Sequence, residues 1–197
     1  MLDAEHILVR MLNQPKIAQI AAYMLSRGGG QMNVLKLTKL LYLSEREAIT
    51  CFGSMMAGDS PHSMPEGPVL TQTLDLTNGA LDSVPGGWNN WVTDKADYEV
   101  ALNPKKKGFD RDDLDELSNA EIEVLDCVWK KFGHMEKYEI RDWTHKYCKE
   151  WEDPHGSSFP IPLERIYKAV GYSNEQSKVL HNEAVAEKYL DRLFSEM

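Results

Sequence analysis

Several features that would place this chain outside the cytoplasm are missing from its sequence. No apolar run approaches the roughly 20 residues needed to cross a bilayer. The first residues, Met1 to His6, are acidic where a signal peptide would be basic. The three cysteines, Cys51, Cys127 and Cys148, are odd in number and far apart, so they do not form a disulfide framework. We therefore expect a cytoplasmic protein with free, buried thiols.

The sequence also lacks a surplus of positive charge. It has 22 basic and 31 acidic side chains, a net charge of −9, and its single basic run is Lys105 to Lys107. Because a duplex-binding surface needs clustered lysine and arginine, we expect no direct binding to nucleic acid. From Asp110 to Asp126 eight acidic residues are opposed by Arg111 alone. This stretch is either a solvated loop and helix start, or a surface complementary to a basic partner.

Motifs for catalysis and for cofactors are scarce. The glycines 28–30 lack both a GK[ST] ending and a preceding strand, so they do not indicate a phosphate loop. His145 and Cys148 are three residues apart on a predicted helix, but a zinc site needs about four ligands. There is no G-x-S-x-G elbow, which leaves a small hydrolase using His62 or His145 as the weaker alternative. We expect no catalytic residue, no metal and no cofactor.

What the sequence does contain is helical periodicity, divided into segments by proline and glycine. Its 197 residues suffice for one domain with a sizeable core. Apolar residues recur at helical spacing, and capping signals mark several starts. The predicted helices run from Asp3 to about Leu12, from Pro15 to Gly28, from a cap at Asn33 to Gly53, from Gly67-Pro68 to Asn78, from a capping box at Ser118 to Gly133, over 137–150, from Pro162 to Gly171, and from a capping box at Ser173 to about Phe194.

Short strands are predicted only in the middle of the chain, as a β insertion around residues 85–109. The segments 91–93 and 98–102 are rich in β-forming residues around a polar turn. Two strands alone are marginal in water, so we expect them to lie against helices or to gain a third strand. Residues 54–66 are predicted to form a long loop. The fold class is therefore mainly α (α+β): a single-domain helical bundle over residues 1–197 with a small antiparallel hairpin or three-stranded sheet.

Several segments resemble the SocA-like Panacea antitoxins. Residues 39–46 are similar to the K-L-L-Y segment of that family. Residues 64–70 are similar to its M-P-x-G-P-V loop and helix start, with Glu66 where many members carry histidine. Further pieces from Leu117 to Ile161 follow in the same order.

The resemblance implies an antitoxin, found beside unrelated toxin types, that acts by direct protein contact. We expect stoichiometric binding of a cognate protein toxin. The alternative is an interaction or regulatory protein of a phage or mobile element that uses the same surface on a host protein.

The partner-binding surface is predicted around the third helix and the long loop that follows it. Long ordered loops tend to be functional, and methionines adapt to unlike partners. Lys39 and Tyr42 are three residues apart and so share a helix face. The predicted contact residues are Lys39, Tyr42, Met55, Met56, Met64 and Glu66, with Trp88 at the margin. The acidic stretch from Asp110 is the alternative location.

Overall fold

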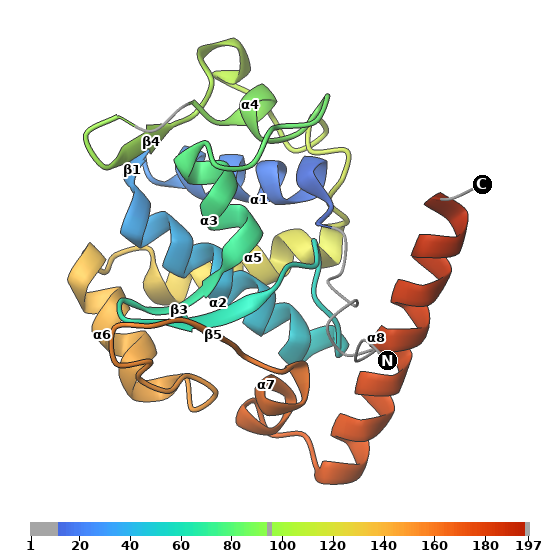
Figure 1. Cartoon of the computed structure of the whole chain (residues 1–197). Coiled ribbons are helices and arrows are strands. Elements are labelled where there is room, and N and C mark those ends of the chain that lie inside the picture. The colour runs from blue at the N-terminus through green and yellow to red at the C-terminus, as the bar shows by residue number, and fades with distance from the viewer. Residues whose placement is uncertain (1–11, 94–95, 196–197) are drawn as a thin grey trace.

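A computed structural model describes residues 12–93 and 96–195 (Figure 1). The part of the chain that it describes is mainly α-helical with a small β component, which confirms the predicted fold class. The first predicted helix, from Asp3, falls almost entirely outside the described residues. The helices are α1 (Gln14–Arg27), α2 (Val34–Phe52), α3 (Thr71–Asn78), α4 (Trp88–Trp91), α5 (Asn119–Phe132), α6 (Lys137–Tyr147), α7 (Leu163–Ala169) and α8 (Asn174–Ser195), with a short 3-10 turn at Pro104–Lys106.

Helix α2 is the central element, and it packs against α1, α5, α6 and α7 (Figure 1). It begins where the side chain of Asn33 accepts a hydrogen bond from the Leu35 amide. It ends at Gly53, which adopts the left-handed conformation with φ 75°. Both ends match the prediction. Apolar side chains at helical spacing, including Leu37, Leu41 and Ile49, are almost completely buried along it.

Helices α1 and α5 are joined by one carboxylate. Glu121 completes the predicted capping box, because it accepts from the Ser118 amide at 2.8 Å while its own amide donates to the Ser118 hydroxyl. The same side chain forms an ion pair of 2.9 Å with Lys16 of α1. The Glu121 carboxylate therefore meets both the positive charge of Lys16 and the backbone amide of Ser118. Partial burial acts to raise the pKa of Glu121, but these contacts outweigh it and lower the pKa. The start of α5 is thereby tied to α1.

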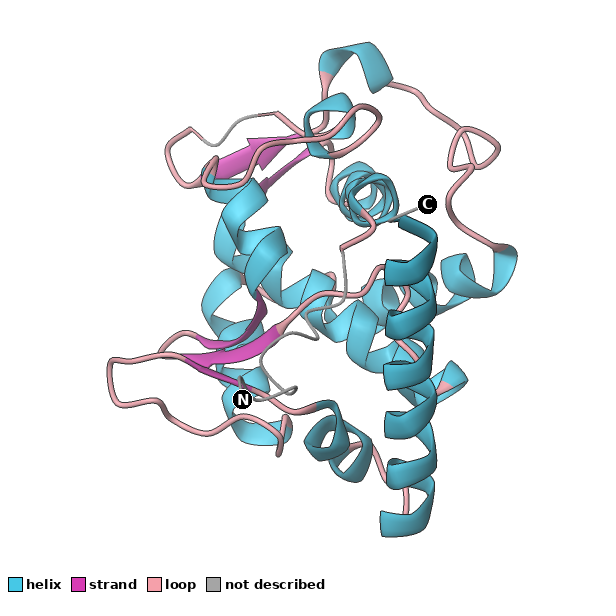
Figure 2. Cartoon of the chain, turned by 45° about the vertical axis from the view of Figure 1, so that its right-hand side comes forward, coloured by secondary structure: helices cyan, strands magenta, loops and turns pink. Residues whose placement is uncertain are grey.

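The first sheet differs from the predicted hairpin. Strand β4 (Glu99–Ala101) lies in the expected segment, but its strand partner is β1 (Gln31–Asn33). The predicted partner, residues 91–93, makes only a short antiparallel contact with this segment, which includes a 2.9 Å hydrogen bond from the Thr93 amide to the Ala101 carbonyl oxygen. Trp91 ends helix α4, and Val92 makes only an isolated bridge to Leu102. This pairing depends on tertiary contact. The chain leaves α1 through the glycines 28–30 and enters β1 directly, and β1 lies beside β4. Figure 2 shows the two small sheets in separate places among the helices.

The second sheet overturns two predictions. Its strands are β3 (Gly67–Leu70), β2 (Pro61–Met64) and β5 (Phe159–Pro160), in the order β3-β2-β5 and antiparallel. Residues 61–64 are thus strand and not loop, and Gly67-Pro68 is strand and not a helix start. Helix α3 begins later, at Thr71, where the carboxylate of Asp59 accepts from the amides of Gln72 and Thr73. The capping residue lies 12 positions before the helix, where a local sequence pattern does not reveal it.

The last two helices follow the predicted pattern. Residues Ser173 and Gln176 exchange hydrogen bonds of 2.9 and 3.2 Å and so form the second capping box. Helix α8 lies at the edge of the molecule and packs chiefly on α7 (Figure 1). Among the described residues, no helix combines the length and the apolar character that a bilayer crossing requires.

Candidate partner-binding site

The predicted contact residues divide into a buried group and an exposed group. Five of the seven side chains are at most 8% exposed, so the free protein does not present them to a partner. The buried group consists of Lys39, Tyr42, Met55, Met56 and Trp88. The expectation of a single exposed surface is therefore corrected: only Met64, which is half-buried, and Glu66, which is exposed, lie at the surface.

Lys39 is enclosed by the protein. Its exposed fraction is 0%, and its Nζ donates a 2.8 Å hydrogen bond to the carbonyl oxygen of Pro68 in β3. Burial lowers the pKa of Lys39 to about 7, although the nearby Cys148 and Glu66 favour its charged form. The side chain does not reach solvent at all. Its visible effect is to hold the β2–β3 hairpin, residues 61–70, against α2.

A second buried contact ties α2 to the segment that follows α6. Glu150 is 0% exposed and accepts hydrogen bonds from the Tyr42 hydroxyl at 2.8 Å and from Arg46 Nε at 2.7 Å. Burial next to this carboxylate raises the pKa of Tyr42 well above its usual value. Burial also raises the pKa of the neighbouring Cys148 thiol to about 12, and Glu150 adds to that shift. Helical spacing in the sequence places Lys39, Tyr42 and Arg46 on one side of α2. Their partners, Pro68 and Glu150, come from other elements that the fold packs against that side.

The two methionines of the segment between α2 and β2 are buried for a specific reason. The carboxylate of Glu45 accepts hydrogen bonds from the amides of Met56 at 2.5 Å and Ala57 at 2.8 Å. This backbone segment is therefore drawn onto α2, and the Met55 and Met56 side chains enter the core. Trp88 is buried in the same core from helix α4, which packs on α1.

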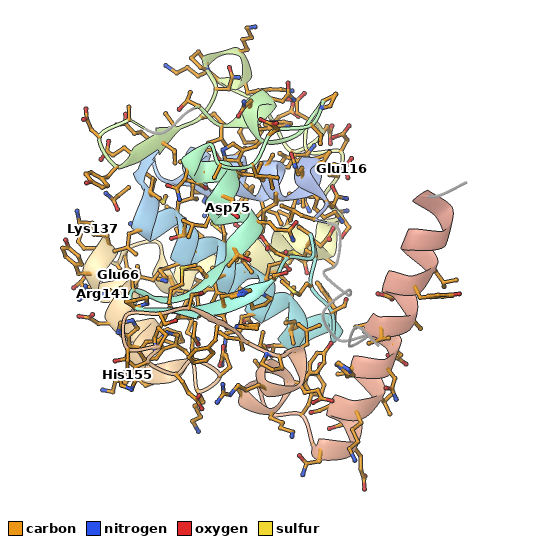
Figure 3. All side chains as sticks on the ribbon, viewed as in Figure 1. Glu66, Asp75, Glu116, Lys137, Arg141 and His155 are labelled. Carbon is orange, nitrogen blue, oxygen red and sulfur yellow. The ribbon has the colours of Figure 1, made fainter. Side chains whose placement is uncertain are left out.

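The tip of the hairpin brings an accessible group of residues together. The exposed carboxylate of Glu66 forms an ion pair of 3.2 Å with Arg141 of α6, and Figure 3 shows the two on one side of the molecule. The carbonyl of Met64 accepts a 3.0 Å hydrogen bond from the indole of Trp151. The Trp151 ring in turn stacks on His145, with ring centroids 4.2 Å apart and an interplanar angle of 8°. The hairpin tip and α6 thus form one continuous surface.

His145, His62 and Cys148, the groups considered for chemistry, are each held in the fold by packing or by a hydrogen bond. His145 Nε2 is buried and has no hydrogen-bond partner among the described residues, and burial, together with Lys39 and Arg141, lowers the pKa of His145. His62 lies in β2 with Nδ1 3.1 Å from the Ser60 carbonyl oxygen. Cys148 is buried beside Glu150, whereas Cys51 and Cys127 are exposed, contrary to the prediction that all three thiols are buried. Residues 12–93 and 96–195 contain no group of three or more potential metal ligands.

The acidic stretch is partly docked onto α1. Gln19 donates from its amide to Asp115 at 2.5 Å and accepts from the Glu116 amide at 2.9 Å. Tyr23 donates to Asp126 at 2.6 Å, and burial together with this hydrogen bond raises the pKa of Tyr23 to about 12. Four acids of the stretch form one wall of an open cavity of about 490 Å³, which is lined by Pro15, Gln19, Pro85, Gly86, Asn90, Trp91, Lys106, Asp112, Asp113, Asp115 and Glu116.

Helix α6 carries a surface that sequence reasoning missed. Tyr138 and Tyr147 are 53% and 47% exposed. Arg141 lies over the ring of Tyr138 and Lys146 over that of Tyr147, at 4.8 and 5.2 Å from the ring centroids. Helical spacing from 137 to 147 could have indicated this pattern, but its basic residues are not consecutive and the net charge of the chain is negative.

A known protein family matches the part of the chain that contains these contacts. The sequence profile of the antitoxin SocA-like Panacea domain matches residues 37–152. The chain belongs to this family. The matched range covers α2, the β2–β3 hairpin, α5 and α6, and therefore both buried contacts described above. Neither the curated proteins nor the solved structures contain a significant match to the chain.

Proposed function

We propose that this protein is an antitoxin that neutralises a cognate protein toxin by direct, stoichiometric binding. The observation that carries the proposal is the family match over residues 37–152, the part of the chain that builds the surface of the hairpin tip and α6. The family is that of SocA-like antitoxins, and a partner of such a domain is a protein.

The state of the candidate catalytic groups supports binding over catalysis. A nucleophilic cysteine needs a lowered pKa, whereas the pKa of Cys148 is raised to about 12 by burial. His145 is stacked on Trp151 and fixed beneath the hairpin, where its ring contributes to packing. We therefore propose that no histidine or cysteine acts chemically in neutralisation.

Within this proposal the predicted contact residues have three roles. Met64 and Glu66 contact the toxin, because they lie at the exposed hairpin tip beside Arg141. Lys39 and Tyr42 act indirectly, since they fix the hairpin and the segment after α6 on helix α2. Met55, Met56 and Trp88 contribute by filling the core.

The test is co-expression with the product of the adjacent gene in a bacterial host. Growth inhibited by that product and restored by this chain, with a co-purifying complex of fixed stoichiometry, is the expected result. His62→Ala, His145→Ala and Cys148→Ala variants that remain folded should still restore growth. A folded His145→Ala variant that binds the toxin without protecting would point to chemistry. A neighbour that is not toxic would favour the phage or mobile-element regulator instead.

A further inference from the structure

The two-stranded sheet of β1 and β4 has an open edge at β1. Residues 92–96 lie along the other side of β4, where the Thr93 and Ala96 amides donate to the carbonyl oxygens of Ala101 and Glu99 at 2.9 and 3.0 Å. Strand β4 is therefore flanked on both sides. In the part of the chain that the structure describes, β4 is the single strand paired with β1. The outer edge of β1 thus has room for another strand.

The register of the sheet shows which backbone groups of β1 point outward. The Leu102 amide donates a 2.8 Å hydrogen bond to the Gly30 carbonyl oxygen, so these two residues form a hydrogen-bonded pair. In an antiparallel ladder, such pairs alternate with pairs whose backbone groups point away from each other. Gln31 and Asn33 belong to pairs of the second kind. Their amides, and the Gln31 carbonyl, therefore point away from β4.

The usual protection of an edge strand is absent from β1. Natural proteins commonly block such an edge with lysine, proline or a bulge. The sequence of β1 is Gln-Met-Asn, and its register with β4 is continuous. Gln31 is exposed, and a Cβ added at Gly29 or Gly30 would meet no atom within 4 Å. An approaching backbone therefore meets open space at the start of the strand.

A strained turn in the same sheet presents a large ring to solvent. Tyr98 is 73% exposed, the highest value among the large apolar side chains that the structure describes. Asp97 and Tyr98, in the turn between Ala96 and Glu99, have φ angles of 49° and 63°. This left-handed conformation is rare for a bulky residue, and glycine or asparagine is favoured in such turns. The turn therefore keeps an aromatic ring in solvent at a conformational cost.

The strained turn and the open edge lie at the same end of the sheet. The carbonyl oxygen of Tyr98 accepts a 2.9 Å hydrogen bond from the amide of Val34, the residue that follows β1. A strand added beside β1 would lie two strand spacings from β4, or about 10 Å. A tyrosine ring and a partner side chain together bridge that separation. Figures 1 and 2 show this sheet on the opposite side of the molecule from α8.

We propose that the open edge of β1 binds an extended segment of the toxin as a third strand, while Tyr98 packs against an apolar side chain of the same toxin. The outward amides of Gln31 and Asn33 donate to the added strand, as in other cases of strand addition. This inference rests on the proposed function, because it takes the toxin as the partner. Strand β1 precedes the family match over residues 37–152, so the edge adds to the contacts proposed at the hairpin tip.

Charge favours a toxin segment over a second copy of this chain. Pairing of two β1 edges would join two molecules that each have a net charge of −9, which opposes self-association. Asp97 and Glu99 also place two carboxylates in the turn beside the edge. The segment that fits is therefore extended, neutral or basic, and carries an apolar side chain for Tyr98.

The first experiment measures amide hydrogen exchange by NMR, for the full chain alone and in complex with the product of the adjacent gene. In the free protein the Met32 amide, which points toward β4, should exchange slowly, and the amides of Gln31 and Asn33 should exchange fast. In the complex, exchange at Gln31 and Asn33 should slow by about tenfold or more. Unchanged exchange at these two residues in a formed complex would overturn the proposal. Slowing in the free protein that increases with its concentration would assign the edge to a second copy instead.

The second experiment tests the ring with two matched glycine variants. His155 also has a positive φ, 50°, and its side chain is 89% exposed. Glycine adopts this conformation without strain, so neither Tyr98→Gly nor His155→Gly should lower the urea midpoint appreciably. Tyr98→Gly should weaken toxin binding by about tenfold, whereas His155→Gly should change it by less than about threefold. Equal effects of the two variants on affinity would show that the ring is not a contact.

The growth assay separates this inference from the proposed function. If the natural protein binds the toxin and restores growth, but exchange at Gln31 and Asn33 is unchanged, the antitoxin role stands and the strand addition is wrong. If the natural protein neither binds the product of the adjacent gene nor restores growth, the proposed function fails, and the assignment of a toxin segment to this edge fails with it.

Discussion

At the scale of single residues, the most informative side chain is Lys39. Its ammonium is completely buried and is satisfied by one carbonyl, that of Pro68. Such a group costs stability whenever it is charged in the folded protein, because its hydration is lost. The lowering of its pKa to about 7 expresses that cost.

Stability of the protein should therefore rise with pH above neutrality. Between about pH 7 and the ordinary lysine value of 10.5, the unfolded chain binds a proton at Lys39 that the folded chain has lost, so the free energy of unfolding increases with pH. The slope from this group reaches at most about 1.4 kcal/mol per pH unit. The window from pH 7 to 9 is the clearest, because above pH 9 the raised pKa of Cys148 acts in the opposite direction.

The measurement is urea denaturation from pH 7 to 9 for the natural protein and for Lys39→Met. The difference in unfolding free energy between the two should grow with pH in favour of the natural protein. Lys105→Met, at an exposed position, serves as the control and should show a constant difference. A constant difference for Lys39→Met as well would mean that the amine is not titrating in the fold.

Replacement of Glu150 should cost considerable stability, because its carboxylate is buried and paired with Arg46. Glu150→Gln leaves Arg46, whose side chain is 16% exposed, without its counter-charge, and we expect a loss of about 3 kcal/mol. Tyr42→Phe removes one neutral donor to the same carboxylate and should cost only about 1 kcal/mol. Denaturant midpoints measure both, with the exposed Glu183→Gln as the unaffected control. A cost for Glu150→Gln no greater than that for Tyr42→Phe would show that the ion pair contributes little.

At the scale of elements, the β2–β3 hairpin is fitted to α6 through a glycine. Gly67 has φ 99°, and a Cβ there would lie 2.8 Å from Thr144 Oγ1 and 3.2 Å from His145 Nε2. Neither neighbour can easily move, since Thr144 bonds to the Arg141 carbonyl and His145 is stacked on Trp151. The close approach of strand and helix requires the absence of a side chain.

Gly67→Ala should therefore cost more than backbone strain alone. Gly156 has a similar φ of 85°, and a Cβ added there would meet no atom within 4 Å, so Gly156→Ala measures the strain by itself, about 1 kcal/mol. Gly67→Ala adds overpacking and should lose roughly a further 1–3 kcal/mol in thermal or urea unfolding. Equal losses of unfolding free energy at the two glycines would mean that α6 moves away from the added methyl group at no cost in stability.

At the scale of the whole molecule, the core extends beyond the limits of the family match. One continuous apolar cluster runs from Ile17 in α1 to Tyr167 in α7, whereas the match covers residues 37–152. Helix α1 contributes side chains such as Ile20 and Met24 that are 0% exposed. Strand β4 lies inside the matched range and its partner β1 lies outside it.

A fragment of residues 37–152 should consequently fail to fold. Loss of α1 exposes the facing sides of α2 and α5, and burying each large apolar side chain contributes about 1.5–3 kcal/mol. Far-UV circular dichroism and urea titration are the measurements, with the full chain expected to unfold in one cooperative step. A fragment with a sharp transition near that of the full chain would show that α1 and α7 are appendages.

The sequence alone was enough to determine most of the helices and the family. Helical spacing and local capping signals are properties of neighbouring residues, which is why α2, α5 and α8 begin where Asn33, Ser118 and Ser173 predicted. The mainly α class follows from the same periodicity. The joint order of short motifs likewise needs no three-dimensional information, and the match over residues 37–152 confirmed it.

Tertiary structure decided the sheets and the accessibility of the site. The pairing of β1 with β4, and the cap that Asp59 supplies to α3, join residues far apart in sequence, so no local pattern encodes them. Lys39 and Tyr42 share a helix face as predicted, but whether that face meets solvent or protein depends on Pro68 and Glu150, which come from other elements. A residue type sets what a side chain can do, and only its packed surroundings set whether a partner can reach it.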